Sequence, residues 1–106
     1  MVEHVQIITT TGTKTDAQRI ARALVEKRLA GCVQVVGPIS STYRWKGSTE
    51  TAEEWLCIVK SRGELYPRLE QAIQAIHPYE VPEILAVPIV QGERQYLKWL
   101  DEVTST

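Results

Sequence analysis

Hydrophobic positions alternate with polar ones in four stretches of the chain, and this alternation predicts four strands. The stretches are residues 4–11, 32–45, 53–61 and 84–90. Because successive side chains of a strand point to opposite faces, Trp55, Cys57 and Val59 would share one face of the third strand. Leu56 and Ile58 would lie on the other face.

Apolar residues recur every three or four positions between these stretches, and this period predicts three helices. The first helix would follow Thr15, which begins a capping-box pattern, and would stop at Gly31. The second would start near Glu64 and end before Pro78, because the residue preceding a proline is driven out of helical geometry. The last helix is expected over residues 93–103.

The predicted order of elements is βαββαβ with an added C-terminal helix, within a single domain over residues 1–106. Two interlocked βαβ halves with right-handed crossovers form, in the simplest arrangement, a ferredoxin-like antiparallel sheet with helices on one face. We therefore expect an α+β fold of this class.

The two middle strands would form a hairpin too long for the domain that carries it. Residues 32–45 would extend over roughly 45 Å, whereas a compact domain of this size has a diameter of roughly 35 Å. Gly37-Pro38 would bend or bulge the strand. Tyr43, Trp45 and Trp55 would be exposed unless another copy of the chain covered them. The geometry therefore predicts an oligomer with these three aromatic residues at its interface.

Composition and charge argue against several classes of protein. A net charge of −1 gives no electrostatic reason to expect a nucleic-acid partner. Apolar runs are far shorter than a membrane span, and no signal-peptide pattern opens the chain, so a cytoplasmic location is expected. Cys32 and Cys57 are interpreted as free thiols packed in strands, with metal ligation or redox chemistry as the alternatives.

Five segments form a distinctive set: RLAGCVQV (28–35), SSTYRWKG (40–47), EEWLCIVKS (53–61), HPYEVPEI (77–84) and GERQYLKWL (92–100). In this order and spacing they resemble the CutA family, named for divalent-cation tolerance. The resemblance covers nearly the whole chain, and the combination of YxWxG with HPYExPE is specific. It implies a homotrimer of ferredoxin-like protomers whose long hairpins lie across neighbours, a shape similar to the PII signalling proteins, and an association with copper and other divalent ions.

The segment 77–84 contains the candidate metal ligands. An incomplete ligand set for Cu(II) or another divalent metal would comprise His77 with Glu80 or Glu83, joined in space by Cys32. We do not expect the protein to require a bound metal. Alternatively, His77 would cap the second helix while the prolines stiffen the corner. Some family members carry a further histidine and cysteine where this chain has an isoleucine and threonines, so weaker metal binding is expected here.

A second candidate group comprises Tyr43, Glu54, Lys60 and Tyr79. In one interpretation the aromatic residues are interface packing and Lys60 pairs with a carboxylate. In the other, Lys60, Glu54, Tyr79 and Glu83 line clefts between subunits, as in PII-like trimers, and bind a small anion or metabolite. No nucleophile–base pair or phosphate-binding loop stands out, so catalysis is not expected.

Three functions remain open from the sequence. The first is a non-enzymatic, homotrimeric protein of divalent-metal (copper) binding or tolerance. The second is a PII-like sensor that binds small molecules at clefts between subunits. The third is a trimeric module that presents a surface to other proteins.

Overall fold

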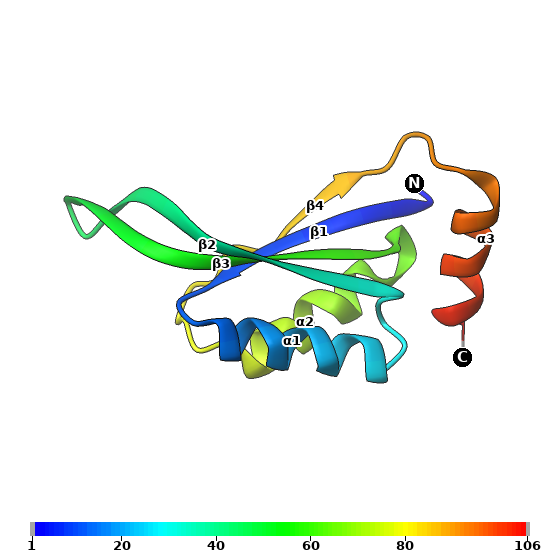
Figure 1. The fold of residues 1–106 in the computed structure, drawn as a ribbon, viewed down its shortest axis with the longest axis horizontal. Helices are drawn as coiled ribbons and strands as arrows, with labels where there is room; N and C mark the ends of the chain where they lie inside the picture. Colours follow the sequence, from blue (N-terminus) through cyan, green and yellow to red (C-terminus); the bar gives the residue numbers. More distant parts are fainter. Residues whose placement is uncertain (1, 106) are drawn as a thin grey trace.

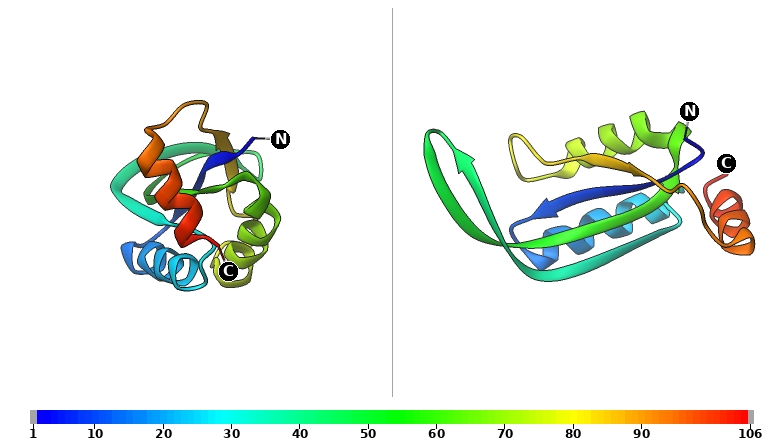
Figure 2. Two further views of the ribbon diagram at one scale, coloured as in Figure 1. Left: turned by 90° about the vertical axis from the view of Figure 1, so that its right-hand side faces the viewer. Right: turned by 90° about the horizontal axis from the view of Figure 1, so that it is seen from above.

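The computed structural model describes residues 2–105 as a four-stranded antiparallel sheet with two helices on one face and a third near one end (Figures 1 and 2). The strands are β1 (His4–Thr11), β2 (Cys32–Trp45), β3 (Ser48–Arg62) and β4 (Leu85–Pro88), in the spatial order β2-β3-β1-β4. The helices are α1 (Lys14–Glu26), α2 (Tyr66–Ile76) and α3 (Arg94–Val103), with a 3-10 turn, η1 (Gly63–Leu65), before α2. This arrangement confirms the predicted ferredoxin-like α+β fold with an added C-terminal helix. None of the helices within residues 2–105 combines the length and the hydrophobicity needed to cross a bilayer.

The hydrophobic core lies between the sheet and helices α1 and α2. Ile7 of β1 and Val59 of β3 point to this side and pack with Leu24 of α1 and Ile73 of α2, all fully buried. Burying an aliphatic side chain of this size contributes about 1.5–3 kcal/mol relative to leaving it exposed. Cys57 lies on the same buried face of β3, whereas Leu56 and Ile58 point to the opposite face, as the alternation predicted.

The ends of α1 differ from the prediction. The N-cap is Thr13 rather than Thr15, because Thr13 has an extended backbone and its hydroxyl accepts a hydrogen bond from the N–H of Asp16 at 3.1 Å. At the other end Arg28 adopts the left-handed conformation (φ 59°) that Gly31 was expected to supply. Gly31 instead lies beneath α3, where its lack of a side chain permits close packing.

Several other boundaries also differ. β3 begins at Ser48 rather than at residue 53, and β4 is limited to Leu85–Pro88 because only these residues pair with β1. The second helix begins at Tyr66, after η1.

The hairpin formed by β2 and β3 projects beyond the rest of the sheet, as predicted (Figures 1 and 2). β1 pairs only with residues 55–62 of β3, so residues 48–54 pair with β2 alone. The expected irregularity at Gly37-Pro38 is present as a register shift between Val36 and Ile39. The molecule is consequently elongated, with extents of 44 × 25 × 23 Å.

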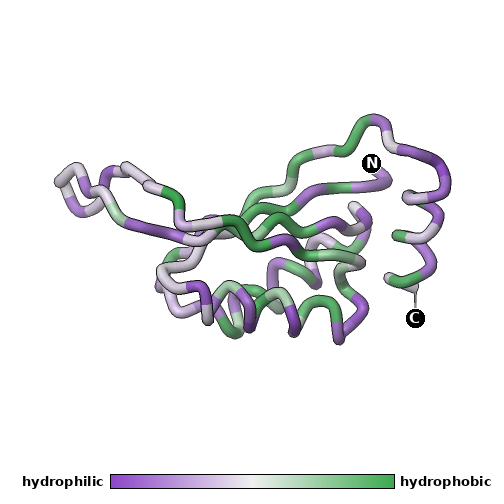
Figure 3. The backbone as a smooth tube through the Cα atoms, viewed as in Figure 1, coloured by the Kyte–Doolittle hydropathy of each residue, from purple (hydrophilic) through white to green (hydrophobic). Residues whose placement is uncertain are grey.

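The sheet face turned away from α1 and α2 also carries apolar side chains, and we call it the open sheet face. Figure 3 shows hydrophobic residues interspersed with polar ones along the central strands. By strand alternation, the apolar members of the open sheet face are Ile8, Val36, Leu56, Ile58, Leu85 and Val87. Half-buried members are Ile8, Leu56 and Ile58, and exposed members are Val36, Leu85 and Val87.

Two neighbouring residues of α1 test the position of the core. Leu24→Ala should lower the free energy of unfolding by about 2–5 kcal/mol, because it removes buried methyl groups and leaves a cavity. Val25→Ala is the matched control, since Val25 is 42% exposed and its substitution should change stability by less than about 0.5 kcal/mol. Urea denaturation measures both. Equal effects of the two substitutions would contradict this assignment of the buried helix face.

Candidate functional site

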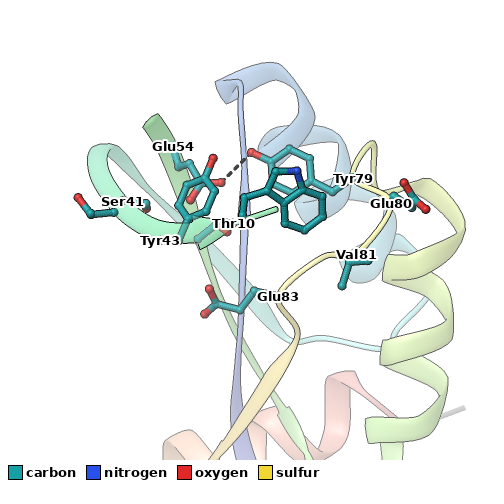
Figure 4. Close-up of a pocket in the computed structure, with 10 residues that line it drawn as sticks. Thr10, Ser41, Tyr43, Glu54, Tyr79, Glu80, Val81 and Glu83 are labelled. Carbon is teal, nitrogen blue, oxygen red and sulfur yellow. Dashed lines mark hydrogen bonds between the residues drawn. The ribbon is translucent and has the colours of Figure 1, made fainter. Parts of the chain in front are cut away.

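A cavity of about 540 Å³ lies where the hairpin leaves the sheet, beside the corner that follows α2 (Figure 4). We call it the hairpin cavity. Side chains from β1, β2, β3 and the corner line it: Thr10, Ser41, Thr42, Tyr43, Trp45, Glu54, Tyr79, Glu80, Val81 and Glu83. Three of these residues are aromatic, and the three charged ones are all glutamates. The wall therefore combines ring faces with negative charge.

Glu54 is the buried carboxylate of the hairpin cavity. It is only 7% exposed, and its Oε2 accepts a hydrogen bond from the hydroxyl of Tyr79 at 2.7 Å, drawn as a dashed line in Figure 4. Within residues 2–105 it forms no ion pair with a lysine or arginine. Burying an ionised carboxylate without a cation is unfavourable, so this position favours a positively charged partner in the cavity.

Tyr79 is held in its protonated form by the same contact. Burial raises the pKa of its phenol above the ordinary value of 10.0, and the hydrogen bond to Glu54 raises it further. The ring also lies against the imidazole of His77, with 4.9 Å between ring centroids. Tyr79 therefore acts as a hydrogen-bond donor that fixes the orientation of Glu54.

His77 ties the end of α2 to β1. Its backbone is extended (ψ 133°), so the helix ends before Pro78 as predicted. Its Nδ1 accepts a hydrogen bond from the N–H of Tyr79 at 3.1 Å, which leaves the proton on Nε2, and Nε2 donates to the carbonyl of Thr10 at 2.8 Å. Both ring nitrogens are thus used within the protomer. A metal ion could bind this imidazole only by displacing one of these hydrogen bonds.

The four predicted metal ligands do not converge. Glu80 and Glu83 line the hairpin cavity, but Cys32 begins β2 and pairs with Lys60 of β3, well away from the corner. Among residues 2–105, no three histidine, cysteine, aspartate or glutamate side chains are placed to hold one metal ion. The predicted set therefore does not form a site within one protomer, because Cys32 is too distant and His77 is already engaged.

The other thiol is equally unsuited to metal binding. Cys57 is fully buried in the core, where burial raises the pKa of its thiol to about 11. Since the thiolate is the form that binds metals, this cysteine serves as a small hydrophobic core residue.

The predicted cleft group is also divided. Lys60 lies six residues from Glu54 along β3, roughly 20 Å away, and its Nζ donates to Oε1 of Gln34 at 2.9 Å. Lys60 therefore does not share a cleft with Glu54 and Tyr79 within one protomer, and the cleft expected between subunits stays a prediction. Without this lysine, the described residues that line the cavity offer no positive side chain to a small anion.

The three predicted interface residues fall on two faces. Tyr43 and Trp45 are 43% and 45% exposed and line the hairpin cavity on the side of the open sheet face. Trp55 points to the other face of β3, where Nζ of Lys14 lies 5.7 Å from its ring centroid. Their place at an interface between copies stays a prediction, and Trp55, which alternates with Glu54 along the strand, would meet a neighbour from the opposite face of β3.

Thr10 is a site residue that the sequence prediction did not include. It is buried at the end of β1, lines the hairpin cavity and provides the carbonyl that binds His77. The alternation over residues 4–11 places Thr10 opposite Val5, Ile7 and Thr9, so its face could be inferred from sequence. Its partner could not, because the two residues lie far apart in the chain.

Comparison with known proteins gives a consistent result over nearly the whole chain. The model of the family described as CutA1 divalent ion tolerance protein matches residues 5–103. The divalent-cation tolerance protein CutA of Thermus thermophilus is 46% identical over 103 residues, which are 97% of this chain and 99% of that protein. The protein CutA of Mus musculus is 46% identical over 90 residues, and the match spans only 51% of its length.

Solved structures agree with these sequence matches. The structure of the Thermus thermophilus protein has a TM-score of 0.93 and 43% identity, and the match covers 96% of this chain and 99% of that one. CutA1 of Oryza sativa has a TM-score of 0.95 and 36% identity, with 98% and 95% covered.

The raised pKa of Tyr79 predicts a loss of stability in alkali. The folded state keeps this phenol protonated while the unfolded chain loses the proton, so the stabilisation is complete below about pH 10 and falls as pH rises toward the folded pKa. Tyr79→Phe removes this contribution. Its free energy of unfolding, measured with urea, should therefore fall less steeply than that of the parent between about pH 9.5 and pH 11. Parallel curves for the parent and Tyr79→Phe would contradict the assignment.

Proposed function

The chain belongs to the CutA1 divalent ion tolerance protein family, and we propose that it acts in divalent-cation tolerance as a non-catalytic homotrimer that binds Cu(II) or another divalent ion between subunits. The observation that carries the oligomeric part is the open sheet face, continuous with the aromatic hairpin. The family supports the link to divalent cations.

Self-association would cover surface that one protomer leaves exposed. Leu85 and Val87 of β4 and Val36 of β2 are exposed on the open sheet face, and Tyr43 and Trp45 extend this surface along the hairpin. Continuous apolar patches of this kind are uncommon on monomers, and a stable interface buries about 800 Å² on each partner. An additional copy is therefore the simplest partner for this surface.

The projecting hairpin favours a ring rather than a two-fold dimer. A hairpin that reaches beyond its own sheet would contact a different part of its neighbour, and the interface is heterologous where that neighbour's hairpin passes on to a further copy instead of returning the contact. Heterologous interfaces close only when repeated by rotation, and three copies form the smallest ring in which each chain covers one neighbour and is covered by the other.

Divalent ions would be bound by ligands from more than one protomer. Glu80 and Glu83 are exposed at the rim of the hairpin cavity, and within residues 2–105 neither forms an ion pair with a lysine or arginine. Because a single protomer does not assemble three ligands, a neighbouring chain would complete the coordination. Among divalent first-row ions Cu(II) would bind most tightly, following the Irving–Williams order.

The hairpin cavity favours a second candidate function, a PII-like sensor of small molecules. At about 540 Å³ it is within the size range of small-molecule sites, and it lies beside the surface proposed for assembly. A ligand bound there would contact the hairpin and the corner together. Binding would then influence how the hairpin meets a neighbour.

Light scattering tests the oligomeric state. We expect the parent at micromolar concentration to have three times the 12.0 kDa mass of one chain. Trp45→Ala should raise the concentration at which the trimer dissociates, because truncating a buried interface aromatic often costs about 2 kcal/mol or more. Val25→Ala, on the solvent side of α1, is the control and should behave as the parent. A monomer mass for the parent would refute the proposed assembly.

Calorimetric titration of Cu(II) into the tag-free protein tests the metal proposal. Replacing Glu80 and Glu83 together by glutamine should weaken binding at least about tenfold, equivalent to about 1.4 kcal/mol. His77→Gln should leave the affinity within about twofold, because the imidazole nitrogens are occupied by protein hydrogen bonds. Unchanged affinity in the double variant would argue against the glutamates, and a large loss in His77→Gln would restore the histidine as a ligand.

A further inference from the structure

We propose that the hairpin cavity binds a positively charged organic nitrogen, an alkylammonium or guanidinium group. This rests on the second proposed function, that the cavity is a ligand site, and it specifies the class of ligand. It differs from the small anion considered for a cleft between subunits, because Lys60 lies outside this cavity.

The charge of the cavity wall is the first argument. Glu54, Glu80 and Glu83 all line the cavity, and no lysine, arginine or histidine does so among the described residues. Glu54 is nine-tenths buried, and its single side-chain hydrogen bond, from Tyr79, occupies Oε2. Oε1 accepts no hydrogen bond from the protein within residues 2–105 and is open to solvent. A cationic N–H group could take the place of solvent at this oxygen and would supply a countercharge.

The aromatic side chains are the second argument. Tyr43, Trp45 and Tyr79 line the same cavity, and a cation near the face of such a ring is attracted by about 0.5–2 kcal/mol, more strongly when it is desolvated. The ring of Trp45 already has a lysine ammonium near it, because Nζ of Lys46 lies 5.8 Å from the ring centroid. Lys46 is at the exposed hairpin tip and is not part of the cavity wall.

The size and ligand geometry of the cavity separate an organic cation from a bare metal ion. A metal ion requires several ligand atoms at about 2.0–2.6 Å, and no three suitable side chains converge on one point within residues 2–105. An ammonium group on a carbon chain can instead place its charge near Glu54 and its methylene groups against the rings. The volume of about 540 Å³ accommodates such a chain.

Two sources could provide this group: a free amine in solution, or a lysine or arginine side chain of a second copy of the protein. Both would place a positively charged N–H group in the cavity, and two experiments on the native assembly distinguish them. Glu54→Gln is the test variant because the amide oxygen can still accept the hydrogen bond of Tyr79 while the negative charge is removed. Glu53→Gln is the matched control, since it changes the net charge equally but points to the opposite face of β3.

The first experiment is calorimetric titration with spermidine, a flexible polyamine, and with fully acetylated spermidine, which carries no charge. If the natural occupant is a free amine, spermidine should bind the parent and Glu53→Gln with equal affinity and Glu54→Gln at least about tenfold more weakly. The affinity of the parent for acetylated spermidine should be lower than that for spermidine by a similar factor. Tyr43→Leu should also weaken binding through loss of the ring, which provides a second variant if Glu54→Gln folds poorly.

The second experiment measures assembly by light scattering on dilution. If the occupant is instead a side chain of a second copy, spermidine should not bind the intact assembly. The assembly of Glu54→Gln, unlike that of Glu53→Gln, should then dissociate at a protein concentration at least about tenfold higher than that of the parent. The proposal is overturned if Glu54→Gln matches Glu53→Gln in both experiments, or if the acetylated and charged amines bind equally. Those outcomes would leave the parent's mass and Cu(II) affinity unaffected, so failure here is distinct from failure of the metal-tolerance function.

Discussion

The end of β1 at Thr11 is the constraint on which the candidate site depends. Thr11 pairs with Trp55, and from Glu54 outward β3 has only β2 beside it. The space that a longer β1 would fill is instead bordered by the corner after α2, and the result is the hairpin cavity. A strand that stops early thus creates both the projecting hairpin and the place where a buried carboxylate faces an open volume.

Two hydrogen bonds fix the other wall of this cavity. The imidazole of His77 binds the carbonyl of Thr10, and the phenol of Tyr79 binds the carboxylate of Glu54, so the corner is attached to both central strands. Side chains held in this way lose little conformational entropy when a ligand arrives. The hairpin wall is less supported, because residues 48–54 pair with a single strand. The site therefore joins a fixed half to a half that a neighbouring molecule could stabilise.

Local sequence signals predicted the elements well, and tertiary contacts account for the differences. Strand alternation, helical periodicity and Pro78 were sufficient for the fold class, whereas the left-handed Arg28 is stabilised by backbone bonds that turn the chain back onto Leu24. Lys60 and Glu54 share a face because their positions differ by an even number, but alternation does not show whether two such side chains are close enough to line one site. The partners of His77 depend on how α2 packs against β1, which no local pattern records.

The topology also sets an order in which the chain can fold. Trp45 pairs with Ser48, only three residues further along the chain, so the outer hairpin can close as soon as both strands have been synthesised. Glu54 meets Tyr79 only after the second helix exists, and β4 joins β1 later still. During synthesis the aromatic hairpin is therefore complete before the corner after α2 and β4 exist. Its aromatic side chains are exposed during that interval, when the nascent chain is most prone to aggregate.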